Sequence, residues 1–81
     1  MATLNDLEQR MLDLEREDWS TSPGGKELAI RERLGLRVMR YYQLLNRLIT
    51  TEAALAYDPI TVNRLLRIRD RRHEAREKAR A

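Results

Sequence analysis

Residues that interrupt helices lie at only three places in this chain of 81 residues. Pro23, Gly24 and Gly25 stand together, Gly35 stands alone, and Pro59 marks the third place. Glycine and proline are the residues that most strongly begin or end helices. Between these places, apolar residues recur at spacings of three and four, which is the period of a helix and not of a strand. The sequence therefore predicts an all-α fold, a small helical bundle of about four helices.

These breaks divide the chain into predicted helices. We expect four main helices and one short helical turn, over residues 5–18, 24–34, 37 or 38–49, 50–57 (the short turn) and from 59 onward. Four of the five segments begin after a side chain that can accept a hydrogen bond from the first turn. The predicted caps are Thr3 or Asn5, Ser22, Thr50 or Thr51, and Asp58. Gly35 is predicted to end the second helix in a left-handed conformation.

The apolar side chains predict a thin core. Burial at this length supplies only about 3 to 5 kcal/mol, so we expect a homodimer or a stabilising partner. Candidates for the core are Leu28, Ile30 and Leu34 in the second helix, and Val38, Tyr41, Leu44, Leu45, Leu48 and Ile49 on one arc of the third. The first helix has an apolar stripe, and its other faces are predicted to be acidic and solvated. These acidic residues are Asp6, Glu8, Asp13, Glu15, Glu17 and Asp18.

The charges are distributed unevenly along the chain. Residues 1–36 hold five basic and eight acidic side chains, whereas residues 37–81 hold eleven basic and five acidic ones. The stretch from Arg33 to Thr51 contains four arginines and no acidic residue. Because exposed helices usually mix both signs, this stretch is predicted to face an anionic partner.

Several classes of function are disfavoured by what the sequence lacks. There is no cysteine and only one histidine, His73, so neither a thiolate metal site nor a histidine cluster is expected. No phosphate-binding glycine loop and no nucleophile paired with a base is present, so we expect no enzyme activity, no cofactor and no small-molecule substrate. No apolar run reaches the about 18 residues that span a bilayer, and the amino end lacks a secretion pattern, so we expect no membrane association and a cytoplasmic, nucleoid-associated location.

The second and third predicted helices have the layout of a helix-turn-helix. A tight turn at Gly35 joins them, and the third helix has one core side and one polar, cationic side. Two positions depart from the usual pattern, because Arg31 stands where a small residue is common and Arg37 where a Ser or Thr cap is common. We therefore expect a variant turn that directs the third helix toward a DNA major groove.

The polar side of the third helix supplies the predicted contacts to DNA. Arginine fits the guanine edge, Gln or Asn fits adenine, and Met fits the thymine methyl, whereas a tyrosine more readily reaches phosphate or sugar. A phosphate contact is also expected at the start of the helix. The predicted DNA-binding residues of this segment are Arg37, Met39, Arg40, Tyr42, Gln43, Asn46 and Arg47.

The last predicted helix adds a basic stripe opposite its apolar side chains. The stripe consists of Arg64, Arg67, Arg71 and Lys78, and the three arginines are predicted to contact phosphates whatever the DNA sequence. No large apolar residue follows Ile68. We therefore divide the chain into a helix-turn-helix domain, residues 1–68, and a basic extension, residues 69–81. The extension is either a projecting helix or a segment that orders when it binds.

Four segments of the chain carry a resemblance to a known family, and they are KELAIRERLGL, RYYQLLNRLI, EAALAYDP and LLRIRDRR. The resemblance covers roughly residues 7–72. It is most specific at Arg40-Tyr41-Tyr42-Gln43, which Leu45-Asn46 closely follow. The sequence resembles small actinobacterial proteins and their phage relatives, a family of unknown function with helix-turn-helix character. The resemblance implies a compact DNA-binding domain in a bacterial cytoplasm and brings no catalytic residues.

The predicted function is double-stranded DNA binding, as a small transcriptional regulator or a nucleoid-type accessory protein. A homodimer on two half-sites would compensate for the few base contacts of one recognition helix. The alternative is a protein-binding adaptor that docks on the transcription machinery through the third helix. An ordinary solvated arginine face would also explain the pattern. RNA binding ranks lower, because it needs open aromatic side chains and only Tyr42 qualifies.

Overall fold

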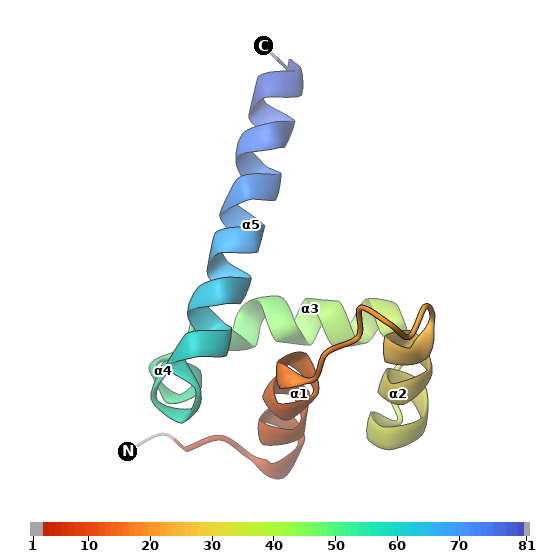
Figure 1. Cartoon of the computed structure of the whole chain (residues 1–81). Helices are drawn as coiled ribbons and strands as arrows, with labels where there is room; N and C mark the ends of the chain where they lie inside the picture. Colours follow the sequence, from red (N-terminus) through yellow and green to blue (C-terminus); the bar gives the residue numbers. More distant parts are fainter. Residues whose placement is uncertain (1–2, 81) are drawn as a thin grey trace.

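The computed structural model describes residues 3–80 and consists of helices joined by short connections, with principal extents of 41 × 35 × 21 Å. The helices are α1 (Asp6–Arg16), α2 (Gly25–Leu34), α3 (Val38–Leu48), α4 (Glu52–Tyr57) and α5 (Pro59–Arg80). In Figure 1, α3 lies across one end of both α1 and α2, and α5 rises from α4 and projects beyond α3. The all-α class predicted from the sequence is confirmed.

Three of the predicted caps begin their helices as expected. The Asn5 side chain accepts a hydrogen bond from the Glu8 N–H at 2.8 Å, and the Glu8 carboxylate accepts one from the Asn5 N–H at 3.0 Å, which completes a capping box. The Thr51 hydroxyl accepts an N–H from the first turn of α4 at 3.2 Å. The Asp58 carboxylate does the same for α5, also at 3.2 Å. These bonds satisfy N–H groups that have no partner within their own helix.

The start of α2 differs from the prediction, because the side chain of Ser22 does not cap it. The residue directly before α2 is Gly24, which is left-handed at φ 75° and makes no side-chain hydrogen bond. The backbone carbonyl of Ser22 instead accepts the N–H of Gly25 at 2.9 Å. A capping side chain must stand directly before its helix. Ser22 stands too early in the chain to do so.

Gly35 ends α2 as predicted, in a left-handed conformation at φ 68°. Its N–H donates to the carbonyl of Arg31 at 3.1 Å, which closes the last turn of the helix. A Cβ added at this position would meet no atom within 4 Å, so the backbone angle, and not crowding, is what favours glycine here. α3 begins three residues later, at Val38.

The core lies where the inner side of α3 meets the other helices. Tyr41, Leu45, Leu48 and Ile49 are buried, as the predicted apolar arc requires, and Val38 and Leu44 are half-buried beside them. The largest fully buried side chains come from four different helices, and they are Tyr41, Met11, Leu12, Ile30 and Val62. The core therefore fixes which side of α3 faces outward.

Leu28 is not a core residue, contrary to the prediction, because 49% of its surface is exposed. Ile30 is fully buried and Leu34 is half-buried. Two residues of a helix that are two positions apart point about 200° away from each other. Once Ile30 faces the core, Leu28 must face the solvent.

α5 changes its surroundings along its length. Its first turns contact α1 and α4, with Thr61 and Val62 buried and Leu65 and Leu66 half-buried. From Arg67 to Arg80 every residue is exposed, and this part projects from the body of the molecule (Figure 1). Within residues 3–80, no helix combines the length and the apolar character needed to cross a membrane.

Candidate nucleic-acid interface

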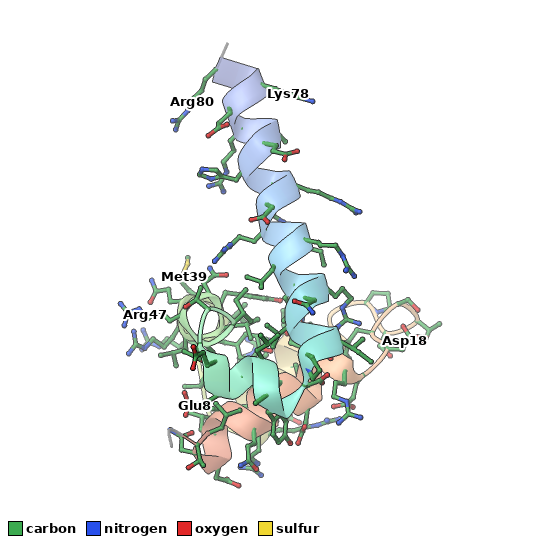
Figure 2. All side chains as sticks on the ribbon, turned by 90° about the vertical axis from the view of Figure 1, so that its left-hand side faces the viewer. Glu8, Asp18, Met39, Arg47, Lys78 and Arg80 are labelled. Carbon is green, nitrogen blue, oxygen red and sulfur yellow. The ribbon has the colours of Figure 1, made fainter. Side chains whose placement is uncertain are left out.

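The outward side of α3 carries five exposed side chains, which we call the outer face: Met39, Arg40, Gln43, Asn46 and Arg47. Met39 is the most open large apolar residue of α3, with 75% of its surface exposed. In Figure 2, Met39 points in the direction in which α5 projects, and Arg47 points sideways, away from α5. The predicted outward register of α3 is confirmed.

The arginines of this segment have no acidic partner in the part of the chain that the structure describes. Within residues 3–80, no carboxylate lies within 4 Å of Arg37, Arg40 or Arg47. Arg37 stands directly before α3 and makes no side-chain cap, so the first N–H groups of α3 have no side-chain acceptor from it. The outer face thus presents guanidinium and amide donors that the fold does not use.

A second feature is an open groove of about 520 Å³ between α3 and α5, which we call the α3–α5 groove. One wall comes from Tyr42 and Asn46 of α3. The floor is apolar and includes Leu45, Leu65 and Ile68. The other wall comes from the projecting part of α5 and consists of Arg69, Arg72, His73 and Arg76.

The charge of the α3–α5 groove is positive. Arg69 lies 3.9 Å from the carboxylate of its neighbour Asp70, and His73 lies 3.6 Å from that of Glu77. Within the described residues, Arg72 and Arg76 have no carboxylate within 4 Å. Lys26 and Glu15 also line the groove but neutralise each other, so the lining has a formal charge of +3 when His73 is neutral.

A largely buried ion pair, Glu15 with Lys26, forms part of the lining of the groove. Glu15, only 5% exposed, has its carboxylate 2.8 Å from the Lys26 ammonium, and it accepts a hydrogen bond from the Tyr41 hydroxyl. Burial and the neighbouring Glu15 carboxylate raise the pKa of Tyr41 far above its ordinary value of 10.0. The tyrosine therefore remains a neutral donor at neutral pH.

The ring of Tyr42 is held against this pair. It packs edge-on against the Tyr41 ring, with 5.1 Å between the centroids, and the Lys26 ammonium lies 5.4 Å from its centroid. Such contacts each contribute about 0.5 to 1.5 kcal/mol. With 36% of its surface exposed, Tyr42 stands on the border between core and groove.

The three predicted arginines of α5 do not share one environment. Arg64 reaches α1, where it donates to the carbonyl oxygen of Glu15 at 2.5 Å, so it stabilises the fold. Arg67 and Arg71 are exposed, but they do not line the α3–α5 groove. At about 100° per residue they lie on the side of α5 opposite to Arg69 and Arg76. The structure thus separates Arg67 and Arg71 from the outer face of α3.

The arginines that line the groove lie outside the basic stripe predicted from the sequence, although their spacing carries a signal. Arg69, Arg72 and Arg76 follow Leu65 at spacings of 4, 7 and 11 residues. These spacings continue the apolar side of α5 along one face of the helix. Because Leu65 faces α3, the three arginines on the same face of α5 also lie on the side of α5 that faces α3.

Four cations outside the outer face and the projecting part of α5 are paired with carboxylates. Each of the following lies within 4 Å of a carboxylate: Arg10 with Asp6, Arg16 with Asp58, Lys26 with Glu15 and Arg33 with Glu17. In Figure 2, Glu8 lies at the end of the body opposite to the tip of α5, where Lys78 and Arg80 stand. Among the described residues, the cations without a carboxylate within 4 Å therefore lie mainly on α3 and α5, with Arg31 of α2 in addition.

Comparison with known proteins gives one match. Residues 3–77 match the model of a family described as a protein of unknown function, DUF3263. None of the curated proteins and none of the solved structures matches this chain. The matched range spans the outer face and all of the α5 residues that line the α3–α5 groove. Within residues 3–80, no group of histidines or carboxylates is arranged to hold a metal ion.

Proposed function

We propose that this chain, which belongs to the DUF3263 family of proteins of unknown function, binds double-stranded DNA through the outer face of α3. The observation that carries the proposal is the exposed set of arginine and amide side chains on α3, none of which has an acidic partner within residues 3–80. A strongly basic surface without compensating carboxylates attracts phosphates and releases their counterions.

In this proposal α2 and α3 act as a helix-turn-helix, and α3 enters the major groove. Arg40 and Arg47 can each pair with a guanine edge through two hydrogen bonds, and Gln43 or Asn46 can pair with adenine. Met39, with 75% of its surface exposed, suits a thymine methyl group. Arg37, at the uncapped start of α3, suits a phosphate.

The role that fits this surface is that of a small transcriptional regulator or a nucleoid-type accessory protein in the bacterial cytoplasm. A homodimer on two half-sites one helical turn apart would double the few base contacts that one α3 can make. Measuring how many chains bind per duplex tests this part of the proposal, since a monomer gives one and a dimer gives two.

The test of the function compares variants of the outer face on a panel of duplexes. We expect Arg40→Ala and Gln43→Ala each to reduce discrimination between preferred and unrelated duplexes by about 1 to 3 kcal/mol, because each variant removes one bidentate pairing with a base. Arg10→Ala serves as the matched control, because Arg10 is an exposed arginine of α1 that pairs with Asp6. It should leave discrimination unchanged.

Two outcomes would redirect the proposal. If no duplex binds even at low salt, α3 is not a DNA-contacting helix, and the adaptor that docks on the transcription machinery becomes the working hypothesis. If single-stranded RNA binds more tightly than duplex DNA, recognition occurs through Tyr42 and not through the major groove. Fluorescence anisotropy with labelled oligonucleotides measures both.

A further inference from the structure

We propose that the α3–α5 groove holds the sugar–phosphate backbone of one strand of the same duplex whose major groove receives the outer face of α3. This inference rests on the proposed function and specifies the side from which α5 contacts DNA. It assigns the backbone contacts to Arg69, Arg72 and Arg76, and not to the stripe of Arg67 and Arg71 on the opposite side of the helix.

The first argument is that the groove and the outer face form one continuous surface. Asn46 belongs to both, and Tyr42 stands one helical turn before it on the wall of the groove. Met39 points in the direction in which α5 projects (Figure 2). A duplex seated on the outer face therefore has the flank of α5 beside it, where a strand bordering the major groove would pass.

The second argument is charge. The three groove arginines extend over a rise of roughly 10 Å along α5, at about 1.5 Å per residue. A guanidinium group matches phosphate oxygens with two parallel hydrogen bonds. Arg72 and Arg76 have no carboxylate within 4 Å among the described residues, so they can make these bonds without breaking an ion pair.

The third argument is the chemistry of the rest of the groove. Its floor of Leu45, Leu65 and Ile68 offers an apolar surface, which suits the carbon face of a deoxyribose, and Tyr42 lies on the wall. Phosphate contacts from arginine, tyrosine and amide side chains position a protein on DNA without reading its sequence. The groove would thus fix the register in which α3 meets the bases.

The structure provides a closely matched pair of variants. Arg72→Ala/Arg76→Ala removes two arginines from the groove side of α5, and Arg67→Ala/Arg71→Ala removes two from the opposite side. All four residues are exposed on the same helix, and each pair is four residues apart. Net charge and helix propensity therefore change equally, and only the side of α5 differs.

The measurement is the dependence of duplex affinity on salt concentration. Each phosphate contact contributes about 0.9 to the slope of log affinity against log salt. We expect Arg72→Ala/Arg76→Ala to reduce this slope by about 2 and to weaken all duplexes by at least about tenfold at low salt. Arg67→Ala/Arg71→Ala should reduce the slope by less than about 0.5, since its side chains face away from the strand.

Several results would overturn the inference. Equal losses in the two double variants would mean that α5 attracts DNA only through its net charge. If both pairs bind like the wild type while Gln43→Ala still alters discrimination, the groove is not used and the proposed function stands. If the wild type itself binds no duplex, the proposed function fails. Polyglutamate that binds as tightly as duplex, with the same dependence on Arg72 and Arg76, would make an acidic protein the occupant.

Discussion

Glu15 is the residue on which the helices around α3 converge. Its carboxylate is bound by Lys26 of α2 and Tyr41 of α3, and its backbone carbonyl accepts a hydrogen bond from Arg64 of α5. A buried carboxylate is stable only when such partners replace its hydration. The same contacts hold Lys26 over the ring of Tyr42, so this buried group also shapes the lining of the α3–α5 groove.

The hydroxyl of Tyr41 gives a prediction at alkaline pH. Its pKa in the folded protein is raised above the ordinary value of 10.0, first by burial and then by Glu15, so the folded protein retains a proton that the unfolded chain loses. The stability that this group contributes is fully present below pH 10.0 and is lost as the pH rises above it. The free energy of unfolding should fall by about 1.4 kcal/mol per pH unit in this range from Tyr41 alone.

Tyr41→Phe should remove the part of the alkaline decrease in the free energy of unfolding that Tyr41 causes. At about pH 9 the variant should be less stable by about 1 to 2 kcal/mol, because Glu15 loses a hydrogen bond but retains Lys26. Urea unfolding at about pH 9 and about pH 11, for both proteins, measures the difference, and groups that they share cancel. Tyr57→Phe is the comparison variant: the hydrogen bond to Asp13 also raises the pKa of this exposed hydroxyl, so its removal should lessen the alkaline loss of stability by less than Tyr41→Phe does. An equal alkaline fall in wild type and Tyr41→Phe would contradict the prediction.

Predictions from the sequence were least accurate for the burial and the partners of single residues. Glu15 was assigned to the solvated acidic side of α1, yet it stands four residues after Met11 and eight after Leu7, on the apolar stripe itself. Its charge suggested exposure, and its position indicated burial. What no sequence pattern supplied is the identity of its partners, because Lys26, Tyr41 and Arg64 reach it only after four helices have packed.

The joint between α2 and α3 is the element that sets the direction of the outer face. Gly35 takes φ 68° there, and Gly24 takes φ 75° at the other end of α2. A Cβ added at either position would meet no atom within 4 Å. The two glycines therefore differ in location but not in the kind of strain that a substitution introduces.

Gly35→Ala and Gly24→Ala form a matched pair for testing the helix-turn-helix. Each should lower the free energy of unfolding by about 1 to 2 kcal/mol, the cost of a left-handed residue with a Cβ. Only Gly35→Ala should also weaken DNA binding under conditions where both variants are folded, since it alone alters the angle between α2 and α3. Thermal unfolding and duplex titration measure the two effects. Equal DNA affinity in both variants would count against a role for this joint.

At the level of elements the sequence was informative, because helix ends depend on local chemistry. Asn5 with Glu8, Gly35, Thr51 and Asp58 each terminate or start a helix where predicted. The side of α5 that lines the groove was not predicted, because the basic stripe was placed on the side of the helix opposite to its apolar residues. The face of α5 that carries Leu65 against the core continues beyond Ile68. There it is occupied by arginines, which form the wall of the groove.

The whole molecule consists of a packed body and a projecting helix with very different environments. Tyr41 and Leu45 lie in the core, whereas every residue from Arg67 to Arg80 is exposed. A helical segment without buried contacts opens with a free energy near zero, even when the body is stable.

Hydrogen exchange should therefore reveal two levels of protection. In the free protein, amides beyond Ile68 should exchange much faster than those around Tyr41 and Leu45, which serve as the internal control. Adding duplex DNA should slow exchange in the stretch 69–76 by at least about tenfold if the strand lies in the α3–α5 groove. Unchanged exchange there in a complex that does form would place the strand elsewhere.

The projecting part of α5 lies at one end of the outer face, which affects how the protein would lie along a DNA duplex. α2 stands at the beginning of α3 and α5 at its end, so the two ends of the outer face are flanked by unlike structures (Figure 1). No rotation of one copy exchanges them. A single bound copy would consequently have a defined direction along the DNA. Its protection from hydroxyl-radical cleavage would extend further on one side of the contacted bases than on the other.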